Sequence, residues 1–182
     1  HLSKYPTLEG KQKYASPIWH LHGETPPKEE VPVTFALLLN LVSASNAADK
    51  ETLWGFISNY SNGATPEEFP ILDQLVGYAL VYYENFVKPN KRYRAATEGE
   101  NKALLSLRDQ LEEMPDTAEA ADLQSMVFSV GKEHNYDNLR EWFGALYEIL
   151  LGQKEGPRMG SFIALYGKDK FIELINRSIK EG

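Results

Sequence analysis

The sequence has no cysteine among its 182 residues, so neither disulfide bonds nor thiolate metal ligands are available to it. This composition suits a reducing compartment, and we expect a cytoplasmic protein. No apolar run approaches the ~20 residues that a membrane-spanning helix requires. The N-terminus has no signal-peptide pattern, because polar and turn-forming residues follow Lys4. We therefore expect no membrane partner.

Positive charge is scarce as well. The 26 Asp and Glu residues outnumber the 19 Lys and Arg residues, and the net charge of −7 argues against a broad electrostatic footprint for duplex nucleic acid. Against this acidic background, Lys88, Lys91, Arg92 and Arg94 place four cations within seven residues. Such a patch suits a partner that brings few phosphates into contact, and it also suits an ordinary solvated surface.

Signatures of catalysis are missing too. The sequence has no Gly-x-Ser-x-Gly nucleophile motif and no glycine-rich phosphate loop that ends in Lys-Ser or Lys-Thr. His20 and His22 are close enough in sequence to share a metal ion, but no third ligand is signalled nearby. We predict no catalytic residue, no metal site and no cofactor site in this chain. A small enzyme that uses His20, His22 or His134 stays open as an alternative.

Apolar residues recur at helical spacing along most of the chain, and no alternating strand pattern of useful length occurs. The sequence therefore predicts an all-α fold of about eight helices in two lobes. We expect an N-terminal connector over residues 1–32, a first helical lobe over 33–96 and a second over 97–182. The basic, proline-bearing stretch 88–96 is the expected linker between the lobes. Helix pairs of this size also leave a helical-repeat scaffold open.

Several residues mark expected helix boundaries. Asp49 is a good N-cap. Thr65-Pro66-Glu67-Glu68 combines a capping box with proline at the first helical position, which predicts a helix that begins there. Thr97 and Glu100 repeat the capping box, and we expect Thr117 to open the next helix.

The segment 156–167, with the sequence GPRMGSFIALYG, is typical of a short helix bracketed by glycines. We expect Gly156 to close the preceding helix, Pro157 to occupy the first helical position and Gly167 to end the helix. Glycine inside a helix costs ~1 kcal/mol relative to alanine. Gly160 therefore indicates a close approach by another backbone or by a ligand.

Arg158 is an unusual residue for the start of a helix. A cation there faces the positive end of the helix dipole, which is unfavourable by a few tenths of a kcal/mol unless an anion shares the site. One interpretation is an anion site made by Arg158 and the free backbone N–H groups. The other is a tight helix junction in which Arg158 pairs with a carboxylate such as Glu155.

Three stretches resemble one known family, namely residues 32–41 (PVTFALLLNL), 53–57 (LWGFI) and 156–167. They are similar, in this order, to the C-terminal part of class I lysyl-tRNA synthetases of the archaeal and alphaproteobacterial type. The resemblance implies an enzyme that activates lysine with ATP and attaches it to tRNA-Lys. It also implies that this chain is only the portion after the catalytic domain, so we expect the fragment alone to be inactive. That catalytic domain is then an expected partner.

The C-terminal region of this family is an all-helical cage that binds the anticodon. We therefore predict that residues 97–182 form the pocket for a U-rich lysine anticodon. The basic stretch is expected to steer the backbone of the anticodon stem-loop through Lys91, Arg92 and Arg94.

Four further residues receive expected roles from their chemistry and position. Arg158 is predicted to contact a phosphate or a base edge, and Ser161 to supply a hydrogen bond. Phe162 or Trp142 is predicted to stack on an unpaired base, as aromatic residues do in the recognition of single-stranded RNA. The rival interpretation is a protein-interaction scaffold of stacked helices without affinity for RNA.

Overall fold

The computed structural model describes residues 33–180, and over this range it contains eight α-helices and no strand. The prediction of an all-α fold with about eight helices is confirmed. The expected connector, residues 1–32, lies outside the described residues, as do His20 and His22.

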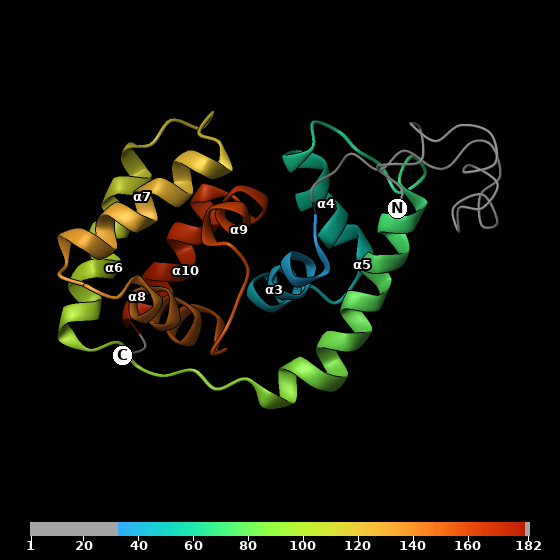
Figure 1. The fold of residues 1–182 in the computed structure, drawn as a ribbon. Coiled ribbons are helices and arrows are strands. Elements are labelled where there is room, and N and C mark those ends of the chain that lie inside the picture. Colours follow the sequence, from blue (N-terminus) through green and yellow to red (C-terminus); the bar gives the residue numbers. More distant parts are fainter. Residues whose placement is uncertain (1–32, 181–182) are drawn as a thin grey trace, which may run out of the picture.

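The first group of helices, on the right in Figure 1, begins the described chain. The last of these helices continues directly into a π-helical turn and a 3-10 turn, which together make one long curved rod. The members are α3 (Phe35–Ser45), α4 (Lys50–Tyr60), α5 (Pro70–Tyr82), η2 (Tyr83–Val87) and η3 (Lys88–Asn90).

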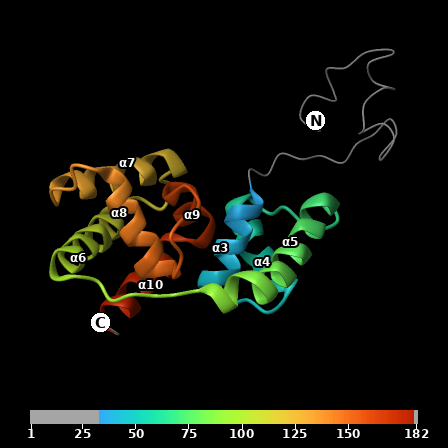
Figure 2. The same ribbon diagram turned by 60° about the horizontal axis from the view of Figure 1, so that its bottom comes forward.

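An extended segment, residues 91–97, then crosses to the second group of helices, on the left in Figure 1 and again in Figure 2. In this group a π-helical turn extends α8. The members are α6 (Glu98–Glu113), α7 (Ala120–Glu133), α8 (Leu139–Leu146), η4 (Tyr147–Leu151), α9 (Met159–Tyr166) and α10 (Lys168–Lys180).

Helix α9 joins the two groups. It packs against α7 and α10 on its own side and against α3 and α4 on the other. The hydroxyl of Tyr166 donates a hydrogen bond to the carbonyl oxygen of Ala44, at 3.2 Å. One hydrophobic core runs through both groups as a result. The boundaries at residues 96 and 97 stay a prediction.

Two of the expected helix starts are confirmed. The Asp49 side chain accepts a hydrogen bond from the backbone N–H of Thr52 and caps α4. Thr97 and Glu100 form a reciprocal capping box at the start of α6, in which each side chain accepts from the backbone N–H of the other residue.

Two other expected starts are wrong. Residues 65–68 form only a turn, and α5 begins at Pro70. A proline disfavours helical backbone in the residue before it, and Phe69 accordingly takes φ −126° and ψ 65°. The helix expected from Thr117 begins instead at Ala120, where Glu119 and Asp122 form the capping box.

The glycine-bracketed segment is a short helix, but its N-terminal boundary differs from the prediction. Gly152, at φ 67°, closes the preceding π-turn in the position expected for Gly156. Pro157 precedes the N-cap, which is Arg158, so it is outside the helix. Gly167, at φ 97°, ends α9 as predicted.

Candidate nucleic-acid interface

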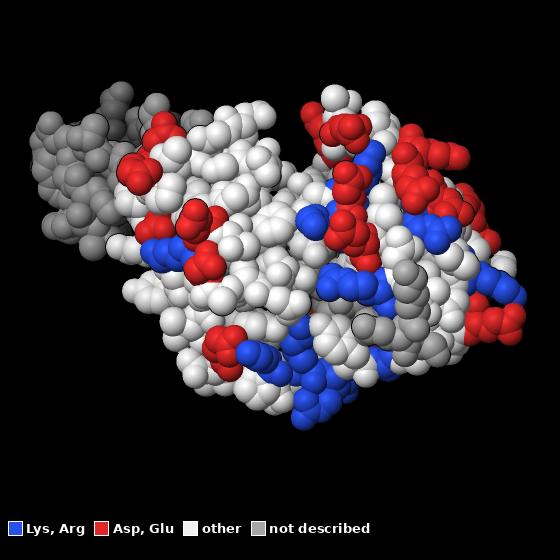
Figure 3. Space-filling model, turned by 180° about the vertical axis from the view of Figure 1, so that it is seen from behind, with Lys and Arg blue, Asp and Glu red and all other residues white. Residues whose placement is uncertain are grey.

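The extended segment between the helix groups lines a cavity of about 520 Å³ together with η4 and the residues 152–154 that follow it. Four cations reach it from the two segments, and we call it the basic cleft: Lys91, Arg92, Arg94 and Lys154. In Figure 3, basic side chains gather at the lower edge of the molecule, over the stretch that joins the groups. The structure thus brings together the three predicted linker cations and adds Lys154.

Arg94 fixes the extended segment to the second group. Its two terminal nitrogens donate to the two carboxylate oxygens of Glu100, at 2.8 Å each, and its Nε donates to Glu148. The hydrogen bonds from Arg94 hold the pKa of Glu100 down at about 2, and the same pairing raises the pKa of Arg94. The charge of Arg94 is neutralised by two carboxylates, so we assign it a positioning role in the cleft.

Arg92 is held by backbone groups instead of carboxylates. Its backbone N–H donates to the carbonyl oxygen of Gly152 at 2.9 Å, which ties the segment to the end of η4. Its guanidinium donates to the carbonyl oxygens of Pro89, at 3.0 Å, and Lys91, at 2.6 Å. An exposed guanidinium in this position is oriented and keeps its charge available to an anion.

Lys91 and Lys154 also keep their charge uncompensated, because neither forms an ion pair with a carboxylate of the described chain. The ammonium of Lys91 lies 4.8 Å from the ring centroid of Tyr93 and 5.6 Å from that of Tyr83. Lys154 is exposed at the rim. With Arg92, they make three cations directed at one cleft.

The cleft also offers a ring surface. Tyr93 is 57% exposed and lies against Gly152, where an added Cβ would come within 3.1 Å of the ring. The buried Nε2 atom of Gln153, also in the lining, has no hydrogen-bond partner among the described residues. Sequence reasoning missed Tyr93, although the alternation of cations and an aromatic residue in KRYR is the available signal.

Arg158 lies apart from this cleft. It is exposed at the N-cap of α9 and lines neither the basic cleft nor the second cavity that is described below. It makes no ion pair with a carboxylate of residues 33–180. The alternative pairing with Glu155 is therefore not formed. Ser161, in the first turn of α9, is half-buried.

The two aromatic residues predicted to stack on a base are core residues instead. Trp142 is fully buried and its indole N–H donates to the carbonyl oxygen of Val127 at 2.9 Å. Phe162 is fully buried too, with its ring stacked on Tyr166 at 5.5 Å and edge-on to Phe171 at 6.1 Å. Neither ring offers a face to a base, so we correct their assignment from RNA contacts to packing.

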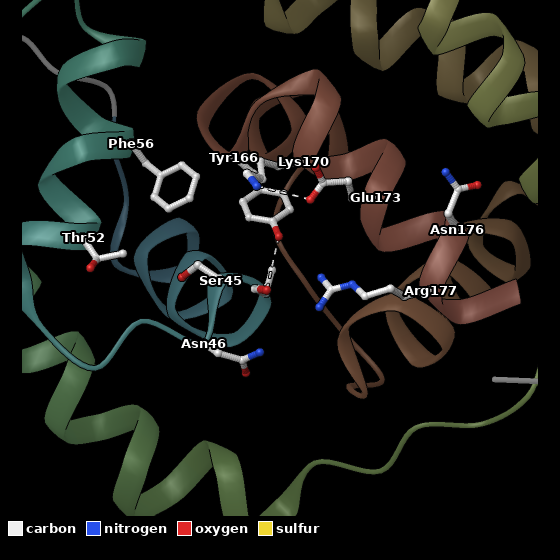
Figure 4. Close-up of a pocket in the computed structure, with 10 residues that line it drawn as sticks. Ser45, Asn46, Thr52, Phe56, Tyr166, Lys170, Glu173, Asn176 and Arg177 are labelled. Carbon is white, nitrogen blue, oxygen red and sulfur yellow. Dashed lines mark hydrogen bonds and ion pairs between the residues drawn. The ribbon is translucent and has the colours of Figure 1, made fainter. Parts of the chain in front are cut away.

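A second cavity, of about 630 Å³, lies where the two helix groups meet, and we call it the inter-group cavity (Figure 4). It is lined by the end of α3, one face of α4, the end of α9 and one face of α10. Phe56 and Tyr166 pack against each other in its wall, with ring centroids 5.6 Å apart. Burial raises the pKa of the Tyr166 hydroxyl, and the positive charges of Arg177 and Lys170 act in the opposite direction.

Other classes of site find little support in the geometry. Over residues 33–180, no three His, Asp or Glu side chains come together in a way that suits a metal ion. His134 ends α7 as its C-cap residue. The part of the chain that the structure describes also contains no helix that is both long enough and apolar enough to cross a membrane.

An all-helical scaffold that holds cations and a tyrosine ring in one ordered cleft is the kind of surface that binds a nucleic-acid backbone. The chain is 44% identical over 178 residues to a lysine--tRNA ligase of Roseobacter denitrificans, an alignment that covers 98% of this chain and 34% of that protein. It is also 44% identical over 174 residues to the lysine--tRNA ligases of Rickettsia akari and Rickettsia felis.

Each of these two alignments covers 94% of this chain and 33% of the relative. The chain thus spans about a third of the length of the curated relatives it matches, and it is homologous to that part of the lysine--tRNA ligases. No protein-family model matches it.

Proposed function

We propose that this chain is the anticodon-recognition part of a class I lysine--tRNA ligase and that its ligand is the anticodon stem-loop of tRNA-Lys. The observation that carries the proposal is the similarity of nearly the whole chain to about a third of the lysine--tRNA ligases, in a chain without catalytic motifs. The parent enzyme would activate lysine with ATP in the cytoplasm, by means of a catalytic domain outside this chain.

The basic cleft gives this proposal its chemistry. Lys91, Arg92 and Lys154 supply three uncompensated cations, which suits contact with a few phosphates on an otherwise acidic protein. Arg94 holds the extended segment in place through its two carboxylate partners. The exposed ring of Tyr93 supplies a surface on which an unpaired base can stack.

Arg158 and Ser161 are proposed as an outer contact of the same RNA. Arg158 is exposed, carries a free charge and stands at the N-terminal end of α9, where the helix dipole also favours an anion. Replacement of Arg158 by alanine should leave stability unchanged, since the side chain is exposed and unpaired. It should weaken binding of the stem-loop; an unchanged affinity removes Arg158 from the interface.

The direct experiment is a gel shift of residues 1–182 with a tRNA-Lys anticodon stem-loop in moderate salt. The control RNA keeps the same stem and carries a different loop sequence. We expect a complex with the lysine-type loop and weaker binding of the control. No binding of either RNA contradicts the proposal. We also expect no lysine-dependent ATP–pyrophosphate exchange by this chain alone, and activity in that assay would overturn the assignment of catalysis to another domain.

A protein-interaction scaffold is the second candidate, and one observation favours it. The outer face of the long rod formed by α5 and η2 exposes Tyr78, Val81, Tyr82 and Phe86, which are 64%, 61%, 44% and 60% accessible. Exposed apolar patches of this kind mark interaction surfaces. If this candidate is right, the stem-loop does not bind in the gel shift. Sedimentation should then show that Phe86→Ser changes self-association or the binding of a partner.

A further inference from the structure

The inter-group cavity has the size and the lining of a binding site for one small ligand. Its volume of about 630 Å³ falls within the range of about 300–1,000 Å³ that small-molecule sites occupy. Phe56 of α4 is half-buried, so one part of the ring packs against Tyr166 while another part faces the cavity. A flat ring at the wall of a cavity is a stacking surface for another flat ring.

Polar groups stand around this ring on both sides of the cavity. Asn46 is the left-handed C-cap of α3, at φ 52°, and its side-chain amide makes no hydrogen bond within the described chain. An amide offers a donor and an acceptor side by side, which matches the edge of a nucleobase. The left-handed backbone fixes where this amide stands, since asparagine is one of the few residues that adopt it readily.

Positive charge enters the cavity from the opposite side. Arg177 extends from α10 toward the end of α3 (Figure 4) and makes no ion pair with a described carboxylate. Lys170 pairs with Glu173 at 3.2 Å on the same helix, and both are exposed. The three charged groups of the lining therefore leave one net positive charge, and Arg177 carries it.

We propose that the inter-group cavity holds one unstacked nucleotide of an RNA loop. The base stacks on Phe56 with its edge toward Asn46, and the adjoining phosphate lies next to Arg177. This inference rests on the proposed function, because it names the place where a loop nucleotide of the same RNA is held. It adds a contact with both helix groups, whereas the basic cleft binds backbone phosphates beside the extended segment.

The first test uses variants of residues 1–182 and an anticodon stem-loop of tRNA-Lys that carries a fluorescent base analogue at one loop position at a time. Stacking on an aromatic side chain contributes ~1–3 kcal/mol per base. Phe56→Leu should therefore weaken binding by between about 5-fold and 150-fold, whereas Phe56→Tyr, which keeps the ring, should bind as the unchanged chain does. One loop position should show quenching that Phe56→Leu abolishes.

The charge is tested separately with Arg177→Gln. Loss of one phosphate contact on a single strand lowers the slope of log affinity against log salt concentration by about 0.7. Arg140→Gln and Phe128→Leu are the matched controls, because Arg140 and Phe128 are exposed and line neither cavity. Both controls should leave the affinity and the slope unchanged. Circular dichroism of each variant establishes that it is folded before binding is measured.

The outcomes separate this inference from the proposed function. If Phe56→Leu and Arg177→Gln bind normally while loss of Lys91 or Arg92 weakens binding, the cavity does not hold a nucleotide and the proposed function stands. If the unchanged chain binds no stem-loop, both are wrong. If uridine monophosphate alone binds as tightly as the stem-loop, the site takes a free nucleotide and the inference of an RNA loop is overturned.

Discussion

The backbone N–H of Gly160 donates a hydrogen bond to Oε1 of Gln124 at 2.7 Å, and both groups are buried. This bond fastens the first turn of α9 to the middle of α7. A Cβ atom on Gly160 would lie 2.2 Å from the carbonyl oxygen of Ala120 and 2.6 Å from the backbone nitrogen of Gln124. Only glycine lets the two helices come this close. The close approach predicted for Gly160 is therefore confirmed, with a backbone as the partner.

Gly160→Ala should destabilise the protein by more than the usual 1–3 kcal/mol of an overpacked core, because the methyl group meets backbone that cannot move without its helix. Gly144→Ala is the matched control. Gly144 is also inside a helix, but apart from the backbone of that helix no atom of the described residues lies within 4 Å of its added Cβ. It should gain about 0.5–1 kcal/mol from helix propensity. Urea denaturation of both variants measures the difference, and equal effects would contradict the packing argument.

Glu100 should make stability depend on pH. Its folded-state pKa is about 2, against an ordinary value of 4.5, chiefly because Arg94 donates to it. A depressed carboxyl pKa adds stability that is present above pH 4.5 and is lost as the pH falls from 4.5 to 2. The Glu100 side chain is 13% exposed and that of Arg94 38%. Solvent screening therefore reduces the contribution to about 1–2 kcal/mol at neutral pH.

Glu100→Gln should accordingly lower the free energy of unfolding by this amount at pH 7, while glutamine preserves the capping box. The difference from the unchanged chain should shrink toward zero by pH 2. Glu98→Gln is the control from the same helical turn, since Glu98 is 85% exposed and its one ion pair within residues 33–180 is with Lys102. Chemical denaturation at several pH values measures both. If the loss of unfolding free energy in Glu100→Gln is the same at every pH, the charge of Glu100 does not stabilise the folded protein.

Short-range sequence patterns predict most of the fold, and the helix boundaries that they predict wrongly have short-range causes as well. The capping box at Thr97 starts a helix because no proline follows it before Pro115, and the box forms despite Gly99 in the first turn. The similar pattern at Thr65 does not start a helix, because Pro70 forces Phe69 out of helical backbone. The periodicity of apolar residues predicts the helices, whereas a single proline moves the start of α5 by four residues, from Pro66 to Pro70.

The candidate site was less predictable, because it depends on contacts distant in sequence. The cations at 91–94 were found from their density, but the pairing of Arg94 with Glu148, 54 residues away, requires the fold. An aromatic residue that can stack on a base differs from a core residue in its exposure to solvent. The spacing of aromatic residues along a helix does not reveal this exposure. Trp142 therefore has the spacing of a stacking candidate although it is buried against α7, whereas Tyr93 is exposed in the cleft and belongs to no helical pattern.

Trp142→Phe tests this reassignment. It removes the N–H that satisfies the carbonyl oxygen of Val127 and leaves space in the core, at a cost of about 1–3 kcal/mol in stability. The folded variant should bind the stem-loop with unchanged affinity, since the indole is buried. Phe128→Leu, which removes one edge-to-face ring contact with Phe143 at the surface, should cost no more than about 1.5 kcal/mol in stability and should leave RNA affinity unchanged. A loss of RNA affinity at a temperature where Trp142→Phe is fully folded would return Trp142 to the interface.

Removal of a cation from the basic cleft should weaken RNA binding, whereas removal of a surface cation outside the cleft should not. Lys91→Ala, Arg92→Ala and Lys154→Ala each remove one cation that has no carboxylate partner within residues 33–180. Each variant should weaken stem-loop binding and lower the slope of log affinity against log salt concentration by about 0.7–0.9, the value for one lost phosphate contact. The effect should be similar for different loop sequences, because phosphate contacts position the RNA without reading it.

Lys102→Ala is the control for net charge, because it removes one positive charge from an exposed turn of α6, outside both cavities. Its salt dependence should match that of the unchanged chain. Filter binding at four or more salt concentrations gives the slopes. If Lys102→Ala lowers the slope as much as Arg92→Ala does, binding follows net charge alone. The cations of the basic cleft then do not bind RNA more than other surface cations do. The contacts of Arg94 with its two carboxylates then stabilise the fold and do not contribute to RNA binding.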